Sequence, residues 1–130
     1  MSVRIQVMTN AAPAAIGPYS QAIQAGGLVF TAGQLGLDPT GGELAAGAAA
    51  QADRALRNLS AILDAAGTSL ERVVKTTIFL ADMADFEPVN EVYATHFSTP
   101  YPARSTVAVK ALPKDALVEI EAIALLGPRG

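Results

Sequence analysis

The chain has 130 residues, of which 51% are hydrophobic and 16% are charged, and its formal net charge is −3. This length allows one domain with a real core but not two independent cores, so residues 1–130 are expected to form a single domain. The net charge is acidic and no Lys/Arg cluster occurs, so the chain lacks the basic surface of a nucleic-acid-binding protein. We expect no DNA or duplex RNA partner.

Cysteine is absent from the sequence, which excludes disulfides, thiolate metal sites and cysteine nucleophiles. The first six residues are interrupted by polar side chains and offer no apolar stretch of the kind found in signal peptides. No window approaches the length and hydrophobicity of a membrane span. We therefore expect a cytoplasmic protein with no membrane partner.

The N-terminal third predicts three strands. Val3–Met8 forms the first, followed by the polar, proline-containing stretch Thr9–Ser20. Gln21–Ala25 and Leu28–Ala32 flank a glycine pair, a pattern that predicts a β-hairpin. Gly33 ends the second strand of this hairpin.

A long amphipathic helix is predicted from Ala45 to Ala66, because apolar residues recur there at helical spacing with charged residues opposite. Gly67 is the expected C-terminal stop of this helix. The segment Thr68–Glu71 has the form of a capping box and predicts one further helical turn.

The second half predicts a strand, a helix and two more strands. Val73–Leu80 is β-branched and apolar at both parities, which suggests a strand that is buried on both sides. Asp85 is the expected cap of the second helix. Its inner face is formed by Phe86, Val89, Tyr93 and Phe97. Ala103–Val109 and Leu117–Leu125 are predicted as a final hairpin, joined by a loop over 110–116.

The predicted order, β-β-β-α-β-α-β-β, indicates an α+β fold with a mixed, mainly antiparallel sheet and both helices on one face. The opposite face of the sheet would then be bare. Since its strands carry apolar residues on that side too, the economical solution is sheet-to-sheet packing in a closed symmetric oligomer.

Glu119 and Glu121 share one face of the last strand by the alternation of side chains. They are either part of a solvated sheet edge or members of a site. If Lys110 pairs with Leu117 in the predicted hairpin, Arg104 falls on the glutamate face. Arg104 could then grip a substrate carboxylate in a two-point fork, or form an ordinary cross-strand ion pair.

Three further residues could line a site. Tyr19 presents an aromatic hydroxyl from a loop constrained by Gly17-Pro18, and Gly33 allows a close approach to the backbone at a strand end. Asn90 lies on the inner face of its helix and needs a hydrogen-bond partner. Loop packing, or tying down backbone, would also explain these residues. His96 is the only histidine, so neither a Ser-His-Asp triad nor a multi-histidine metal site can form within one chain. We expect no metal and, without glycine-rich nucleotide motifs, no organic cofactor.

Six ordered motifs carry a specific resemblance that runs from about Ala12 to Leu126. They are Ala14–Gln21 (AAIGPYSQ), Thr31–Gln34 (TAGQ), Val74–Thr77 (VKTT), Asp85-Phe86 with Val89-Asn90, Pro102–Ser105 (PARS) and Glu119–Ala122 (EIEA). Together they make the chain resemble the RidA (YjgF/YER057c-like) family.

This resemblance implies a chorismate-mutase-like α+β fold, assembled as a homotrimer with three clefts between subunits. The implied reaction is hydrolysis of reactive 2-imino acids, such as 2-iminopropanoate and 2-iminobutanoate, to 2-oxo acids and ammonia. These imines derive from enamines that pyridoxal-phosphate-dependent dehydratases release. The same resemblance implies the activity of a 2-iminobutanoate/2-iminopropanoate deaminase.

The resemblance also assigns roles by position. Arg104 would bind the substrate carboxylate, and Glu119 would hold and polarise the attacking water. Tyr19 would line the cleft from the neighbouring chain, while Gly33 and Thr106 would contribute backbone groups. Asn90 would support the cleft wall.

The chain departs from the family pattern at Ala32, where relatives often carry serine, so a hydroxyl that could orient substrate or water is missing. A non-catalytic role, as a chaperone-like or small-metabolite-binding trimer, is the main alternative. Arg104 favours the enzyme, because a holdase has no need of a cationic fork beside a carboxylate. The ribonuclease label of some relatives does not suit an acidic chain without a basic groove.

Overall fold

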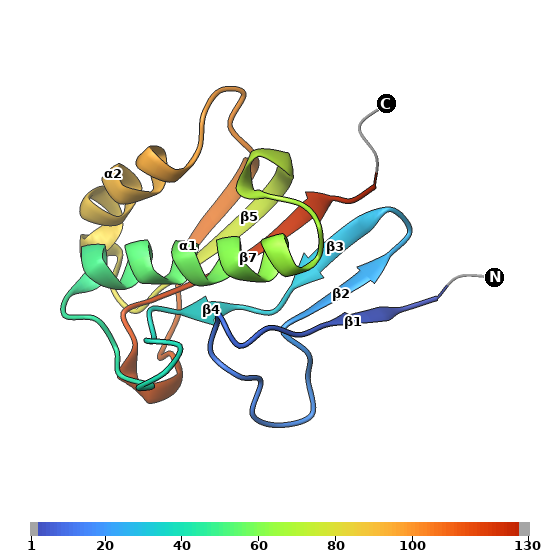
Figure 1. The fold of residues 1–130 in the computed structure, drawn as a ribbon. Coiled ribbons are helices and arrows are strands. Elements are labelled where there is room, and N and C mark those ends of the chain that lie inside the picture. Colours follow the sequence, from blue (N-terminus) through green and yellow to red (C-terminus); the bar gives the residue numbers. More distant parts are fainter. Residues whose placement is uncertain (1–2, 128–130) are drawn as a thin grey trace.

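The computed structural model describes residues 3–127 and contains one mixed sheet with two α-helices (Figure 1). The strands are β1 (Ile5–Val7), β2 (Ala22–Ala25), β3 (Leu28–Thr31), β4 (Gln34–Leu35), β5 (Val73–Leu80), β6 (Ala103–Ala108) and β7 (Val118–Leu125), and the helices are α1 (Ala48–Ala65) and α2 (Phe86–His96). Short 3-10 turns cover Leu70–Arg72, Met83–Asp85 and Pro113–Asp115. The predicted order of elements is confirmed, with the two-residue strand β4 as an addition.

The sheet has the strand order β1-β2-β3-β7-β5-β6, and β4 also pairs with β7. All pairs are antiparallel except β5 with β6, which is parallel. The predicted hairpin of Ala103–Val109 with Leu117–Leu125 is therefore wrong. The chain leaves β5, crosses through α2 and returns in the same direction, so β6 adds to the edge beside β5. Strand β7 then fills the centre, between β3 and β5.

This topology moves Arg104 away from its expected partners. Arg104 pairs with Thr76 of β5 rather than with a residue of β7. Thr76 in turn pairs with Ala122, which belongs to the opposite parity from Glu119 and Glu121. Since paired residues share a face of the sheet, Arg104 lies on the helix side, and the prediction that it shares the glutamate face is wrong.

Helix α1 supplies most of the core. Its inner face is fully buried at a run of apolar residues that includes Leu56, Leu59, Ile62 and Leu63. The helix begins three residues later than predicted, after Gly47, and ends at the expected place, where Gly67 has a φ of +86°. A positive φ is easily adopted by glycine, so Gly67 acts as the predicted stop.

Two predicted capping arrangements are wrong in detail. The turn after Gly67 forms, but no side chain caps it, and the Thr68 hydroxyl instead donates 2.7 Å to the carbonyl oxygen of Leu125. Asp85 stands at the N-cap position of α2 without a side-chain bond to the helix. The Asp82 carboxylate accepts from the Ala84 N–H at 2.9 Å and caps the preceding turn.

Both helices cover the same face of the sheet (Figure 1), as predicted. The expected inner face of α2 is confirmed at Val89 and Tyr93, which are buried, while Phe86 and Phe97 pack partly buried against the core. Strand β5 is buried on this side alone within the single chain, since residues 75–80 alternate between half-buried and buried and Val74 is exposed.

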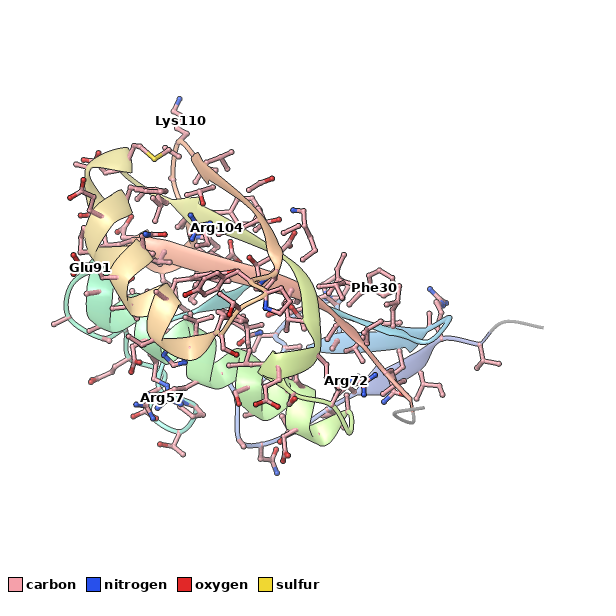
Figure 2. The ribbon with its side chains drawn as sticks, turned by 90° about the horizontal axis from the view of Figure 1, so that it is seen from above. Phe30, Arg57, Arg72, Glu91, Arg104 and Lys110 are labelled. Carbon is pink, nitrogen blue, oxygen red and sulfur yellow. The ribbon has the colours of Figure 1, made fainter. Side chains whose placement is uncertain are left out.

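The other face of the sheet has no helix over it, and we call it the open face. It carries Phe30, Phe79, Val107 and Ile123 together with Glu119, Glu121 and Lys75, as the strand registers require. Phe30 and Val107 are 41% and 43% exposed, and Phe30 points away from α1 in Figure 2. Large aromatic and branched side chains are thus partly or largely exposed to solvent on this face.

Candidate active site

The carboxylate of Glu119 lies in a cleft of about 420 Å³ between the end of β3, strand β4 and two loops. Tyr19 and Gly33 line the same cleft, so three of the residues expected in the site come together within one chain. The remaining wall is largely apolar and consists of Pro13, Ile16, Gln34, Leu35, Leu37, Pro113 and Lys114. A mostly apolar cleft with one carboxylate and one phenol suits a small organic ligand.

Gly33 is required by the position of Glu119. A Cβ built on Gly33 would lie 2.7 Å from Cδ and 2.9 Å from Cγ of Glu119, closer than real side chains approach. The backbone of Gly33 does not have a positive φ. Glycine is therefore required here because a side chain would occupy the space of Glu119, and not because the backbone adopts an unusual conformation. The sequence predicted a close approach at this position, and the group that approaches is the Glu119 side chain.

The environment of Glu119 raises the pKa of its carboxyl group above the usual 4.5. Partial burial disfavours the charged form most, and the neighbouring Glu121 carboxylate adds repulsion. Arg104 does not contribute, because it lies on the other face of the sheet. A carboxyl group whose pKa is shifted toward neutrality is suited to taking up and returning a proton.

Tyr19 reaches this cleft from a tight turn. The Tyr19 N–H donates 2.8 Å to the Gly17 carbonyl across Pro18, and Gly17 has a φ of +122°. The Tyr19 ring is 53% exposed, so its hydroxyl can meet a ligand. Tyr19 lines the same cleft as Glu119 of its own chain, and its contribution to a cleft shared with a neighbouring chain stays a prediction.

Two buried carboxamides that the sequence did not single out hold the cleft walls. Asn58 of α1 donates to the carbonyl oxygens of Leu35 and Leu37 at 3.1 and 2.9 Å. Gln51 accepts 2.8 Å from the N–H of Leu117, which lies next to β7 and two residues before Glu119. In the helical pattern both look like polar positions, and only the packed fold reveals their backbone partners.

Arg104 occupies a separate hollow of about 430 Å³ beside α2, formed with Asn90, Tyr93, Ala94, Tyr101 and Pro102 (Figure 2). Its Nη1 donates 2.8 Å to Oδ1 of Asn90, and its guanidinium lies 4.9 Å from the ring centroid of Tyr93. Asn90 therefore has the partner that its position requires, namely the guanidinium. The hydrogen bond to the Asn90 amide oxygen and the aromatic face of Tyr93 together fix the orientation of the planar guanidinium.

The aromatic support of Arg104 is itself fixed. The Tyr93 hydroxyl lies 2.7 Å from the Thr76 hydroxyl, in a buried hydrogen bond, and the Phe86 ring centroid lies 5.7 Å from the guanidinium. Thr106 follows on β6 opposite Ile78, and its buried hydroxyl has no partner among the described residues. Arg104 and Thr106 thus face the helix side of an edge strand.

The expected site residues fall into two groups within one chain. Glu119, Tyr19 and Gly33 share one cleft, whereas Arg104 and Asn90 share another, and no residue of the described chain lines both. Thr106, the sixth expected residue, lines neither of them. Over residues 3–127, no three His, Asp or Glu side chains are placed to hold a metal ion. The described part of the chain also has no helix with the length and hydrophobicity needed to cross a membrane.

Comparison with known proteins identifies the family. The family model described as Endoribonuclease L-PSP matches residues 9–126. The mouse protein named 2-iminobutanoate/2-iminopropanoate deaminase is 52% identical, over 97% of this chain and 94% of its own length. The human and rat proteins of the same name are 47% and 50% identical, and an Arabidopsis thaliana relative named Reactive Intermediate Deaminase A is 54% identical. These relatives support the expected reaction, the deamination of reactive imines.

Solved structures agree with the sequence comparison. RidA from the Antarctic bacterium Psychrobacter sp. is 48% identical, with a TM-score of 0.91 over 94% of this chain and 99% of that one. Escherichia coli TdcF with bound serine is 44% identical, with a TM-score of 0.89 over 95% and 99%. The predicted resemblance is confirmed, and the chain belongs to the Endoribonuclease L-PSP family, which is the RidA/YjgF family.

Proposed function

We propose that the protein hydrolyses 2-imino acids to 2-oxo acids and ammonia in clefts that two copies of the chain complete together. One observation supports this proposal most strongly: a half-buried carboxyl group, Glu119, lies beside Gly33 and Tyr19 with a raised pKa. The names of the relatives supply the substrate class, 2-iminobutanoate and 2-iminopropanoate.

The reaction needs water to attack the C=N carbon and a proton to reach the nitrogen. Glu119 as carboxylate accepts a proton from the water, whose oxygen bonds to the imine carbon while the C=N electron pair moves to nitrogen. The protonated Glu119 then gives its proton to that nitrogen. The carboxylate, free again, takes the hydroxyl proton of the carbinolamine and passes it to the amino nitrogen. The oxygen electron pair forms the C=O bond of the 2-oxo acid as the C–N bond breaks, and ammonia leaves. A carboxyl group that is easily protonated in its cleft serves both transfers.

The substrate carboxylate requires a cation, and Arg104 is the candidate. Asn90 and Tyr93 hold the guanidinium in one orientation, which reduces the entropy lost when it binds a carboxylate in a two-point fork. Gly33 lies between β3 and β4, and Thr106 lies within the edge strand β6. Their backbone groups can add hydrogen bonds to the ligand.

Arg104 and Glu119 lie on opposite faces of one sheet, so one chain cannot bring both to one substrate. Packing of two chains through their open faces can bring Arg104 of one copy to Glu119 of another. The exposed aromatic and branched side chains of this face favour burial against another sheet. We assign the chain to a homotrimer of chorismate-mutase-like architecture, with the open faces inside and the helices outside. Each cleft then takes Glu119, Tyr19 and Gly33 from one copy and Arg104 from the next.

Residues 1–130 act as a single domain in this proposal, and the protein works in the cytoplasm, where dehydratases release enamines. A non-catalytic role as a small-metabolite-binding trimer uses the same clefts. The structure of TdcF with bound serine favours this alternative, because serine is a small metabolite. The two roles differ in turnover and not in binding.

A coupled assay separates them. A pyridoxal-phosphate-dependent dehydratase acts on serine or threonine, and release of the 2-oxo acid is followed with and without the protein. An enzyme accelerates this release in proportion to its concentration, at amounts far below that of the imine. If release proceeds at the uncatalysed rate, the protein is a binder.

A further inference from the structure

Gln21 is a buried glutamine, 3% exposed, that directly precedes β2 and closes the segment Gly17–Gln21. Its side chain makes more hydrogen bonds than the rest of that segment. Oε1 accepts from the Thr9 N–H at 2.8 Å, and the two hydrogens of Nε2 are donated to the carbonyl oxygens of Thr9 and Pro13 at 3.1 and 2.7 Å. The carbonyl oxygen of Ala12, at 3.4 Å, shares one of these two hydrogens. One carboxamide therefore satisfies the backbone at both ends of Thr9–Pro13.

The main chain of Gln21 makes a further link. Its carbonyl oxygen accepts from the N–H of Ala32 at 2.9 Å, directly beside Gly33. Pro13 and Tyr19 both line the Glu119 cleft. The Gln21 side chain bonds to the Pro13 carbonyl oxygen, and Tyr19 lies two residues before Gln21. We call the loop over 9–20 the Tyr19 loop. Gln21 thus links this loop to the end of strand β3, beside the Glu119 cleft.

The chemistry of the site requires a carboxamide. The Thr9 N–H needs an acceptor, and the carbonyl oxygens of Thr9 and Pro13 need donors, which only an amide side chain supplies together. Glutamate at this position would set a negative charge against carbonyl oxygens. An apolar residue would leave the part-buried N–H and carbonyl groups of this segment without their partner, and each unpaired group is costly to the extent that it is buried.

From these contacts we propose that Gln21 is a positioning residue, whose carboxamide fixes the Tyr19 loop so that Tyr19 lines the Glu119 cleft. The inference rests on the proposed function for its effect on turnover, but not for its effect on the loop. Gln21 touches no substrate. It acts by removing conformations in which Tyr19 swings away from the cleft, and catalysis is sensitive to such displacement.

The test compares Gln21→Met with Gln24→Met. Methionine keeps the length and volume of glutamine and removes its hydrogen bonds. Gln24 lies on β2 and makes one long bond of 3.4 Å to the carbonyl oxygen of Ala66, away from the cleft, so Gln24→Met is the matched control. Gln21→Glu, which retains the acceptor for Thr9, serves if the methionine variant does not fold.

The first measurement is amide hydrogen exchange. Gln21→Met is expected to speed exchange in the Tyr19 loop about tenfold, because hydrogen bonds that close the loop are lost. Exchange in α1 and β7 should stay unchanged, and Gln24→Met should leave the Tyr19 loop as in the wild type. Unchanged exchange in the loop of Gln21→Met would overturn the proposal.

The second measurement is a double-mutant cycle on kcat/KM with Tyr19→Ala. Gln21→Met alone should lower kcat/KM about tenfold or more, and should add little to the loss that Tyr19→Ala causes, because both changes remove the same group from the cleft. Independent, additive losses would contradict the positioning role. A wild-type protein without deaminase activity would refute the proposed function instead, and loop exchange would then decide alone whether Gln21 holds the loop.

Discussion

The Glu119 side chain fills the space that a Cβ on Gly33 would occupy. Gly33→Ala should therefore displace the carboxylate without disturbing the backbone, since alanine can adopt the conformation of Gly33 and the clashing atoms belong to a movable side chain. We expect kcat to fall about tenfold or more, with little change in the free energy of unfolding. Steady-state kinetics and thermal unfolding check this.

Gly41→Ala is the control for that substitution. A Cβ on Gly41 would lie no closer than 3.9 Å to Asp38, far from the cleft. Wild-type activity in Gly33→Ala would mean that the carboxylate does not need its present position.

Glu119 and Glu121 differ in role although they share a face of β7. Glu119→Gln keeps size and most hydrogen bonding but removes the base, so turnover should fall by about two orders of magnitude. KM should change much less, because the carboxylate grip belongs to Arg104. Glu121→Gln, which we assign to structure, should retain most activity. Equal losses in the two variants would instead make the pair an interface scaffold.

The pH dependence of kcat/KM follows from the raised pKa of Glu119. Below that pKa the carboxyl group is protonated and cannot accept a proton from water, so the acid limb of the profile should lie above the ordinary 4.5. Glu121→Gln removes the neighbouring charge and should shift this limb to lower pH. An acid limb that Glu121→Gln leaves in place would assign it to another group.

The same shift makes a prediction for stability. The folded protein holds the Glu119 proton more tightly than the unfolded chain does, so the free energy of unfolding should decrease as pH rises from the ordinary carboxyl pKa through the raised one. Glu119→Gln should remove this part of the pH dependence. Denaturant unfolding at several pH values measures it.

Arg104→Lys tests the grip on the substrate. A single ammonium cannot reproduce the planar fork, or its stacking on Tyr93, so kcat/KM should fall roughly 10- to 100-fold while the assembly is kept. Arg57→Lys is the matched control, because Arg57 forms an exposed ion pair with Asp53 on the surface of α1. Near-full activity of Arg104→Lys would make Arg104 a structural residue.

Local patterns in the sequence were sufficient to predict both α-helices and every strand except the two-residue β4. Helix α1 follows from its apolar spacing and Gly67, strand β5 is predicted with its observed bounds, and the shared face of Glu119 and Glu121 follows from strand alternation. Each of these features depends on neighbours a few residues away. The close approach at Gly33 was also expected from a local pattern, a glycine at the end of a predicted strand.

Strand pairing could not be predicted in this way. Strand β6 is followed by β7 after a short loop, which is typical of a hairpin, yet it pairs with β5, because the crossover through α2 brings it there. The position of Arg104 depends on this choice. The contacts of Gln51 and Asn58 also depend on tertiary packing, since their partners lie 66 and 21–23 residues away.

The central claim is that each active site takes Arg104 from one copy and Glu119 from another. Arg104→Lys and Glu119→Gln chains, each nearly inactive alone, can be refolded together in equal amounts. In random closed trimers, about a quarter of the clefts then receive an intact arginine from one copy and an intact glutamate from the next. We expect the co-refolded mixture to have deaminase activity near a quarter of the wild-type value. When the separately assembled variants are simply combined, we expect no activity beyond the residual activities of the two variants. A co-refolded mixture no more active than its two components would contradict it.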